Sequence, residues 1–416
     1  MGRDDIITGI DIGTSHVRVV SGQFKVDNEG HESMHIIGAA EAQAEGISKG
    51  SIMSIEDAVS SISAALEKCE RMTGAPVEHA LVSVNGAHVV AQESHGVVAV
   101  SKASGEVGED DAERAIEAAQ NVATPPNYEI LHIIPRSFTV DDQTGIKDPV
   151  GMTGIKLEVD VQVVLGMTSQ VKNLTKSIYR TGVDIDELVV EVLAASEAVL
   201  TKKQKDTGVA VVNIGGATTS LMVFEEGEVL HTKVLPVGAA HITNDIAIGL
   251  RTSVDVAEQV KVVHGTALAE EVQKRDEIDL ADFDENESVR VSRKEIAEII
   301  SARIEEIFEM VRAELKEIDR DAKLPGGIVL TGGGAKLDGI VDVAKDHFRM
   351  SSRIGTPVEV QTPIEKIQDP SFSTAVGLVL WGQGVHSGMN RPSLTNFSSV
   401  ADVTGKMGKW LKSLIP

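Results

Sequence analysis

Residues 209–224 read VAVVNIGGATTSLMVF, and residues 6–20 near the start of the chain read IITGIDIGTSHVRVV. Each stretch is an apolar run that ends in Asn or Asp, passes through glycine and hydroxyl residues, and enters a second apolar run. Short apolar runs joined by a glycine turn predict two strands in a hairpin. The sequence therefore predicts the same hairpin twice, which indicates two related halves.

The composition supports a folded protein of more than one domain. At 416 residues the chain exceeds the usual size of a single hydrophobic core. Hydrophobic residues make up 42% of the chain but aromatic residues only 3%, so the cores must consist of Val, Ile, Leu and Ala. This composition is typical of α/β domains, whose sheets are covered by helices.

Charge and cysteine content narrow the class of protein. A formal charge of −24 argues against nucleic acid as a main partner, because phosphate backbones require clustered Lys and Arg. Cys69 is the single cysteine, so no intramolecular disulfide can form and a reducing compartment is expected. The N-terminus does not read as a signal peptide, and no apolar run is long enough to span a bilayer. We therefore expect a cytoplasmic protein.

Between the two hairpins the pattern predicts helices at residues 55–72, with Ser54 as the N-cap, and at residues 169–180. Residues 85–166 are expected to form a compact insert of alternating apolar segments with one helix at 109–120.

After the second hairpin we expect helices at residues 239–250 and 254–263, followed by an acidic stretch at 270–287. That stretch is either a solvated loop or edge, or an interaction surface. Ser292 and Glu295 form an S-x-x-E capping box before a long amphipathic helix that ends near Lys316.

The glycine turns of the two hairpins suit an anion. Glycine lets the backbone approach a phosphate closely, and consecutive N–H groups form a positive nest. Asp11 is placed to organise water around Mg²⁺, or it is only a turn-forming residue at a strand end. Two such turns facing each other would grip a polyphosphate from both sides, through Gly13, Thr14 and Ser15 of the first and Gly215, Gly216, Ala217 and Thr218 of the second.

Two further features suggest contacts to a nucleoside. The glycine turn Gly332, Gly333 and Gly334 either lets a flat base lie against the backbone or is simply a tight strand-to-helix turn. Glu258 and Lys261 are spaced to share one helix face, where a surface ion pair is the alternative interpretation.

The order of these segments resembles the nucleotide-binding superfold of actin and the heat-shock chaperones. Within it, the chain is similar over nearly its whole length to FtsA, a bacterial cell-division family. The resemblance rests on the phosphate turns, AEQVK (257–261) and VLTGGGAKLDG (329–339), and more specifically on GIKDPVGMTGIKLEVDVQVVLG (145–166), LAASEAVLT (193–201), HTKVLPVGAAHITNDIAIGLRT (231–252) and FSTAVGLVLWG (372–382).

This resemblance implies an α/β fold of duplicated actin-like (ribonuclease H-like) domains with a small α+β insert, a flexible linker and a C-terminal amphipathic helix. The implied domains are a first actin-like domain at 1–84, 167–193 and 371–384, the insert at 85–166, a second actin-like domain at 194–370 with an outer subdomain at about 236–315, a linker at 385–402 and the helix at 403–416.

The resemblance also assigns site residues. It implies that ATP and Mg²⁺ bind between the halves, with Glu258 and Lys261 at the ribose and Lys336 beside the adenine-side glycines. Family members usually place Asp, Ile and three glycines at the second turn, whereas this chain has Asn213 and Ala217. Asn keeps one acceptor oxygen but removes a negative charge beside the metal. We therefore expect slow or absent hydrolysis.

The end of the chain reads KMGKWLKSLIP, residues 406–416. Met407, Trp410, Leu411 and Leu414 fall on one helical face, flanked by Lys406, Lys409 and Lys412. So short a helix is expected to lie in the headgroup layer of an anionic membrane. The alternatives are a disordered tail or a helix docked on the protein itself.

The family implies an adaptor at the cytoplasmic face of the membrane at the division site. It would bind the C-terminal tail of FtsZ, form actin-like protofilaments and recruit later division proteins. PilM, a pilus-assembly relative with a similar insert, is the nearest alternative. A sugar kinase of the same superfold would need a substrate pocket with a catalytic carboxylate, and the sequence suggests no candidate for it. A heat-shock chaperone would need a substrate-binding domain after Gly382, and the residues that follow are too few to form one.

Overall fold

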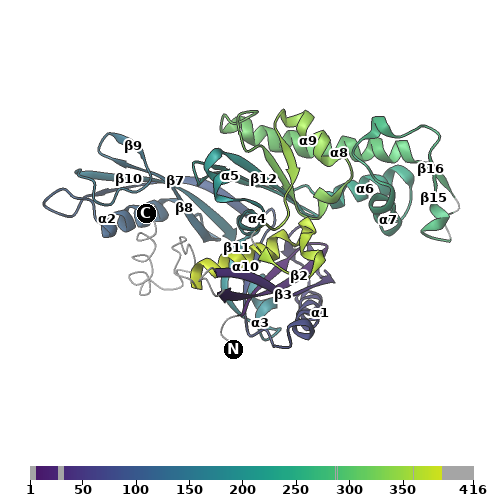
Figure 1. Cartoon of the computed structure of the whole chain (residues 1–416), viewed down its shortest axis with the longest axis horizontal. Coiled ribbons are helices and arrows are strands. Elements are labelled where there is room, and N and C mark those ends of the chain that lie inside the picture. Colours follow the sequence, from purple (N-terminus) through teal and green to yellow (C-terminus); the bar gives the residue numbers. More distant parts are fainter. Residues whose placement is uncertain (1–5, 27–31, 286, 288, 359, 387–416) are drawn as a thin grey trace.

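The computed structural model describes residues 6–26, 32–285, 287, 289–358 and 360–386. The molecule is elongated, with the sheet of β7 and β10 at one end and α6, α7, β15 and β16 at the other (Figure 1). Two further sheets lie between these ends, one above the other in that view.

The first central sheet begins with the N-terminal hairpin. β1 and β2 pair antiparallel, β3 continues the meander, and β6 and β11 add parallel strands on the other side of β1. The sheet order is β11 (Asp184–Val190), β6 (His79–Val84), β1 (Ile6–Ile12), β2 (His16–Val26), β3 (Glu32–Gln43) and β19 (Val360–Gln361).

The second central sheet repeats this plan. β12 and β13 form the second hairpin, β14 continues the meander, and β17 and β18 add parallel strands beside β12. Its order is β14 (Glu228–Leu235), β13 (Thr219–Glu225), β12 (Val209–Ile214), β17 (Ile328–Thr331) and β18 (Ser352–Ile354). The hairpin that recurs in the sequence therefore opens a sheet of the same topology in each half.

The helices connect and cover these sheets. They are α1 (Ile55–Thr73), α3 (Thr168–Tyr179), α4 (Glu191–Val199) and α5 (Lys202–Thr207) before the second hairpin, and α6 (Ala239–Leu250), α7 (Val254–His264), α8 (Arg293–Glu317), α9 (Ile340–Phe348) and α10 (Ser373–His386) after it. Ser54 caps α1 by accepting a hydrogen bond from the Asp57 N–H, as the sequence predicts. Ser292 caps α8 through the Glu295 N–H in the same way.

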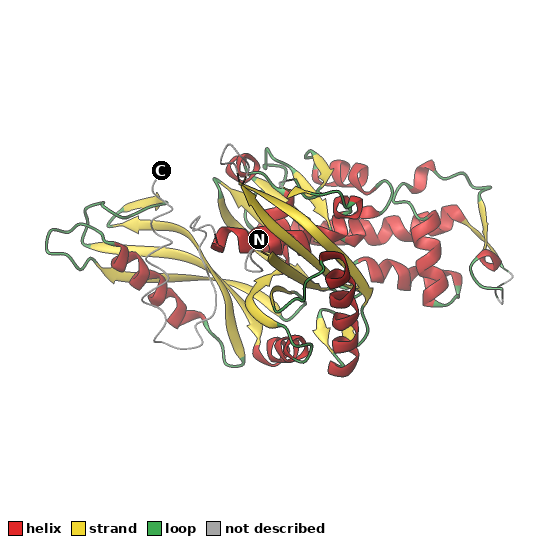
Figure 2. Ribbon diagram, turned by 60° about the horizontal axis from the view of Figure 1, so that its bottom comes forward, coloured by secondary structure: helices red, strands yellow, loops and turns green. Residues whose placement is uncertain are grey.

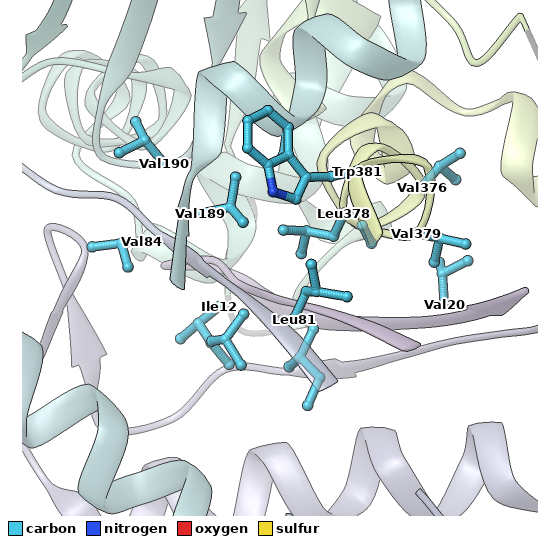
Figure 3. Close-up of a cluster of buried hydrophobic side chains, with 14 of the residues drawn as sticks. Ile12, Val20, Leu81, Val84, Val189, Val190, Val376, Leu378, Val379 and Trp381 are labelled. Carbon is cyan, nitrogen blue, oxygen red and sulfur yellow. The ribbon is translucent and has the colours of Figure 1, made fainter. Parts of the chain in front are cut away.

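Helices α4 and α10 cross where the two halves meet. A Cβ on Gly377 of α10 would overlap the carbonyl oxygen of Ala194 in α4, so the backbones approach as closely as glycine permits. On its other side α10 covers the first sheet: Figure 3 shows Leu378 and Val379 above Leu81 and Val20. All four side chains are buried. The crossing is therefore part of a continuous core.

The insert is a sheet with a helix on one face (Figure 2). Its strand order is β7 (Val89–Ala99), β10 (Lys156–Met167), β8 (Tyr128–Val140) and β9 (Gln143–Ile146), and α2 (Glu109–Ala123) packs on β7 and β10. The insert has its own apolar core, which includes Phe138 and Leu157.

A buried histidine joins the insert to the first sheet. The Nε2 atom of His132 on β8 accepts a hydrogen bond of 3.0 Å from the N–H of Val190 on β11. Burial lowers the pKa of His132 to about 3, so this ring is neutral at physiological pH.

The outer end of the second half contains α6, α7, α8 and the small sheet of β15 (Glu277–Asp279) and β16 (Arg290–Ser292). The described residues of the acidic stretch at 270–287 include the end of the 3-10 helix Ala269–Glu271, the strand β15 and the 3-10 helix Leu280–Asp282. A two-stranded ribbon of β4 (Ile47–Ser48) and β5 (Ser51–Ile52) precedes α1.

Two details differ from the expectations. α10 ends at His386, whereas the linker was expected to begin at residue 385. The glycine turn after β17 forms a short 3-10 helix, Gly333–Lys336, before α9 begins at Ile340.

Candidate functional site

The two glycine turns lie against each other. In the first turn the Gly13 N–H donates to the His16 carbonyl at 3.1 Å, and in the second the Gly215 N–H donates to the Thr218 carbonyl at 2.9 Å. A Cβ on Gly216 would lie 2.6 Å from the Ser15 hydroxyl oxygen. The predicted phosphate turns, although far apart in the sequence, therefore meet across the junction of the two halves.

The remaining residues of the turns are engaged within their own halves. The Thr14 hydroxyl accepts a 3.2 Å hydrogen bond from the Gly50 N–H, while Ala217 and Thr218 are buried. The start of α6 lies on the second turn, since the Ala239 N–H donates to the Gly215 carbonyl at 2.9 Å.

The third glycine turn packs on the second hairpin. Gly332 has a φ of 84°, and a Cβ there would overlap the side-chain oxygen of Asn213. A Cβ on Gly334 would overlap the Ile214 side chain. A Cβ on Gly333 would have only the Ser371 Cβ within 4 Å, at a distance of 4.0 Å. The structure thus brings the third turn beside the second, with open space at its middle glycine.

Two buried carboxyl groups lie below the turns. Asp11 at the end of β1 is 4% exposed and accepts a 2.8 Å hydrogen bond from the Ser83 hydroxyl. Glu191 at the start of α4 is 8% exposed and accepts a 3.3 Å hydrogen bond from Ser220 on β13.

The two carboxyl groups influence each other's ionisation. Burial raises the pKa of Asp11, and this effect is opposed by the charge of Arg18 and the hydrogen bond from Ser83. Burial raises the pKa of Glu191 to about 8, and the negative charge of Asp11 adds to this rise. A divalent cation beside the pair would remove this repulsion, and oxygen atoms are the ligands that Mg²⁺ prefers.

These residues fit a magnesium-bound polyphosphate. The turns supply N–H groups and space, and the buried acids supply negative charge behind them. Within the described part of the chain no group of three His, Cys, Asp or Glu side chains gathers to hold a metal ion. Water and phosphate oxygens would therefore have to complete the coordination, as is usual for Mg²⁺.

Glu191 and Arg18 were missed by the sequence interpretation. Glu191 directly follows the apolar end of β11, and a lone acid inside an apolar run was the available signal. Arg18 stands opposite Asp11 in the β1–β2 register, so the hairpin pairing alone could have indicated it.

Glu258 and Lys261 form an ion pair on α7. The Lys261 ammonium lies 2.6 Å from the Glu258 carboxylate and 2.8 Å from the Thr243 hydroxyl on α6. The Lys261 side chain is 11% exposed while that of Glu258 is 49% exposed. The carboxylate is therefore the accessible partner of the pair.

Lys336 pairs with Asp369, its ammonium 2.5 Å from the carboxylate.

The predicted membrane residues Lys406, Met407, Lys409, Trp410, Leu411, Lys412 and Leu414 lie outside the described residues. Across the part of the chain that the structure does describe, no helix is both long and apolar enough to cross a bilayer.

Comparison with known proteins identifies the family. The model of the cell division protein FtsA matches residues 210–377, and the model of the SHS2 domain inserted in FtsA matches residues 86–165. The FtsA of Pseudomonas aeruginosa is 34% identical over 412 residues, covering 98% of this chain and 97% of that protein. The chain belongs to the FtsA family. The FtsA of Bacillus subtilis is 38% identical over a match that covers 91% of this chain and 84% of the Bacillus protein.

Solved structures place the FtsA-family chain in the actin-like fold. The PilM–PilN type IV pilus biogenesis complex superposes with a TM-score of 0.65 at 18% identity, covering 90% of this chain and 98% of its own. MreB5 of Spiroplasma citri bound to ADP superposes with a TM-score of 0.53 at 14% identity, covering 92% and 98%. The predicted family and duplicated actin-like fold are confirmed, and the FtsA interpretation takes precedence over PilM.

Proposed function

We propose that this FtsA-family division protein binds ATP with Mg²⁺ between its two halves and links FtsZ to the cytoplasmic face of the membrane at the division site. The observation that carries the nucleotide part is the meeting of the two glycine turns above the buried pair Asp11 and Glu191.

Each residue has a role in this proposal. Asp11 would hold Mg²⁺ through water, and Glu258 and Lys261 would bind the ribose. The phosphates would be surrounded by the residues of the two glycine turns: Gly13, Thr14, Ser15, Gly215, Gly216, Ala217 and Thr218. Gly332, Gly333 and Gly334 would lie against the adenine, with Lys336 at its side. MreB5, with a similar fold, has been solved with ADP, which supports the proposal that the chain binds a nucleotide.

Hydrolysis is proposed to be slow or absent. Bound Mg²⁺ would neutralise charge on the phosphates, but a base is still needed to activate water. Glu191 is the candidate base, and without a bound cation its pKa of about 8 keeps it largely protonated at neutral pH. Asn213 supplies no charge in place of the usual acid. ATP would then act as a conformational and assembly ligand.

Calorimetry tests the nucleotide proposal. Titration of the protein with ATP in magnesium buffer should give a heat of association that is lost in Asp11→Ala. Asp57→Ala, an exposed acid on α1, is the matched control and should bind as the parent does. Absence of binding to any adenine nucleotide by the parent protein, or rapid turnover that Asp11→Ala abolishes, would contradict the proposal.

The adaptor part of the proposal rests on the family and on the C-terminal residues. Lys406, Lys409 and Lys412 suit anionic headgroups, and Trp410 with its apolar neighbours suits the interface. The outer subdomain near residues 236–315 is proposed to take the FtsZ tail, the actin-like fold to self-associate into protofilaments, and the complex to recruit later division proteins.

A pelleting experiment separates these parts. ATP, anionic liposomes and FtsZ are each omitted in turn, and we expect FtsZ to reach the liposome pellet only when this protein is present. Binding to an FtsZ tail peptide distinguishes the adaptor from a PilM-like scaffold, for which the structural likeness is the supporting observation. FtsZ sedimentation that does not depend on this protein would contradict the tether.

A further inference from the structure

The first glycine turn ends in a histidine, His16, beside the junction of the two halves. His16 accepts the turn hydrogen bond through its carbonyl and begins β2, so it directly follows Ser15, which touches Gly216 of the opposite half. The His16 side chain is half-buried. Within the described residues its ring makes no hydrogen bond or ion pair.

The pleat of the sheet determines on which face of β2 the His16 side chain lies. Side chains on a strand alternate, so His16 and Arg18 share one face of β2 while Val17 lies in the core on the other. Arg18 is opposite Asp11 in the β1–β2 register, and paired residues share a face. His16, Arg18 and Asp11 therefore line the same face, the one on which Asp11 interacts with Glu191.

The charges around His16 come from both halves. Arg18 on β2 and Glu41 on β3 act from its own sheet, while Glu258 on α7 and Lys336 after the third glycine turn act from the second half. The last two are the residues proposed to lie at the ribose and the adenine. Charged residues of both halves thus act on His16.

The surroundings of His16 favour the neutral form of its imidazole ring. Burial lowers the pKa of His16, Arg18 and Lys336 lower it further, and the acids Glu41 and Glu258 only partly oppose them. A polyphosphate between the turns would reverse this balance, because a negative charge close to an imidazole favours its protonated form.

We infer that His16 contacts the phosphates of the bound nucleotide and takes up a proton when it binds, so that nucleotide affinity is linked to pH. This inference rests on the proposed nucleotide site. Protonation would add a charge-assisted hydrogen bond to a phosphate oxygen, which is stronger than a neutral one. Affinity should rise as pH falls from about 8 to about 6, because histidine changes charge in that window.

The test is calorimetry with ATP and excess Mg²⁺ in buffers of different ionisation enthalpy, which reports protons taken up on binding. The parent protein should take up part of a proton, and His16→Gln should not. For each unit by which binding raises the pKa, the parent should gain about tenfold in affinity at low pH relative to His16→Gln. Protonation of ATP itself cancels in this comparison.

Two variants sharpen the result. His16→Lys, which is charged throughout this range, should bind tightly with little pH dependence. His79→Gln, an exposed histidine on β6, should behave like the parent. Nuclear magnetic resonance of the parent protein, with the His16 ring assigned through the parent's own backbone signals, should show that the pKa of His16 rises on nucleotide binding even if a variant folds poorly.

Equal proton uptake and equal pH profiles for the parent and His16→Gln, or an unchanged His16 titration, would overturn the inference and leave the nucleotide site intact. Absence of nucleotide binding by the parent and all variants at every pH would overturn both, and it would locate the failure in the proposed function.

Discussion

Asp11 and Glu191 show how single residues acquire their chemistry from the fold. Asp11 ends the first strand of the hairpin, and Glu191 begins the helix after β11. Both are buried, and the charge of Asp11 helps to raise the pKa of Glu191 from its ordinary value of 4.5 to about 8. A protonated buried acid costs less than a charged one, so the protein without bound cation holds a proton here.

Glu191→Gln should change how stability depends on pH. Because the folded-state pKa of Glu191 is raised, its contribution to stability is complete below pH 4.5 and is lost as pH rises toward 8. Glutamine does not ionise, so the variant does not lose this stability. In magnesium-free buffer the free energy of unfolding of the variant minus that of the parent should therefore increase by about 1.4 kcal/mol for each pH unit between 4.5 and 8. Urea-unfolding midpoints at several pH values measure this, with the exposed Glu67→Gln as control. Parallel pH curves for the parent and Glu191→Gln would refute the prediction.

Asn213→Asp tests the proposed role of the missing charge. Its carboxylate would lie beside Glu191, to which the Asn213 side chain hydrogen-bonds, so the variant should unfold more easily without Mg²⁺ and bind the magnesium-nucleotide complex roughly tenfold more tightly. ATP hydrolysis should also become faster. Urea unfolding measures the stability, calorimetry the binding and phosphate release the hydrolysis, with Asn173→Asp on α3 as control. Unchanged magnesium dependence would show that Asn213 is remote from the metal.

At the scale of elements, the crossing of α4 and α10 joins the two halves. The N-terminal end of α10 lies at the second and third turns, where Ser373 contacts the Thr331 hydroxyl at 2.8 Å and Thr374 accepts from Asn213 at 3.4 Å. Toward its other end, the Trp381 indole N–H donates to Glu187 on β11 at 3.0 Å. One helix therefore contacts both sheets.

Gly377→Ala should destabilise the protein although alanine is the better helix former. The added Cβ would overlap the Ala194 carbonyl, and moving a helix backbone should cost about 2 kcal/mol or more. Gly249→Ala on α6 is the matched control, because its Cβ would meet only the flexible end of Ile299 at 2.7 Å. Thermal unfolding compares them, and a more stable Gly377→Ala would mean that the helices are free to separate.

At the scale of the whole molecule, the acidic body and the basic end of the chain have opposite electrostatic roles. A net charge of −24 opposes contact with anionic lipid, while Lys406, Lys409 and Lys412 favour it. The proposed membrane contact should therefore depend on the residues after 402 and weaken as salt screens them.

Trp410→Glu should reduce sedimentation with anionic liposomes to the level seen with neutral liposomes, because an acid cannot enter the interface. Trp410→Phe keeps an apolar ring and should retain much of the binding. Liposome pelleting at low and high salt measures the effect. Unchanged binding of Trp410→Glu would indicate that the end of the chain is not the membrane contact.

Much of the fold could be predicted because its signals are local. The strand pattern with its glycine turn identified both hairpins, and Ser54 marked the start of α1, because caps and periodicity act within a few residues. The candidate turn residues were found for the same reason, since a phosphate nest is a local backbone shape.

The sequence by itself determined the repeated hairpins, the main helices, the insert and the residues of the glycine turns. Only the tertiary structure decided that Ser15 touches Gly216, that the charge of Asp11 acts on Glu191, and that the charges of Glu258 and Lys336 act on His16. These relations depend on how two sheets pack across α4 and α10, and burial and charge act through space, so no local pattern records them.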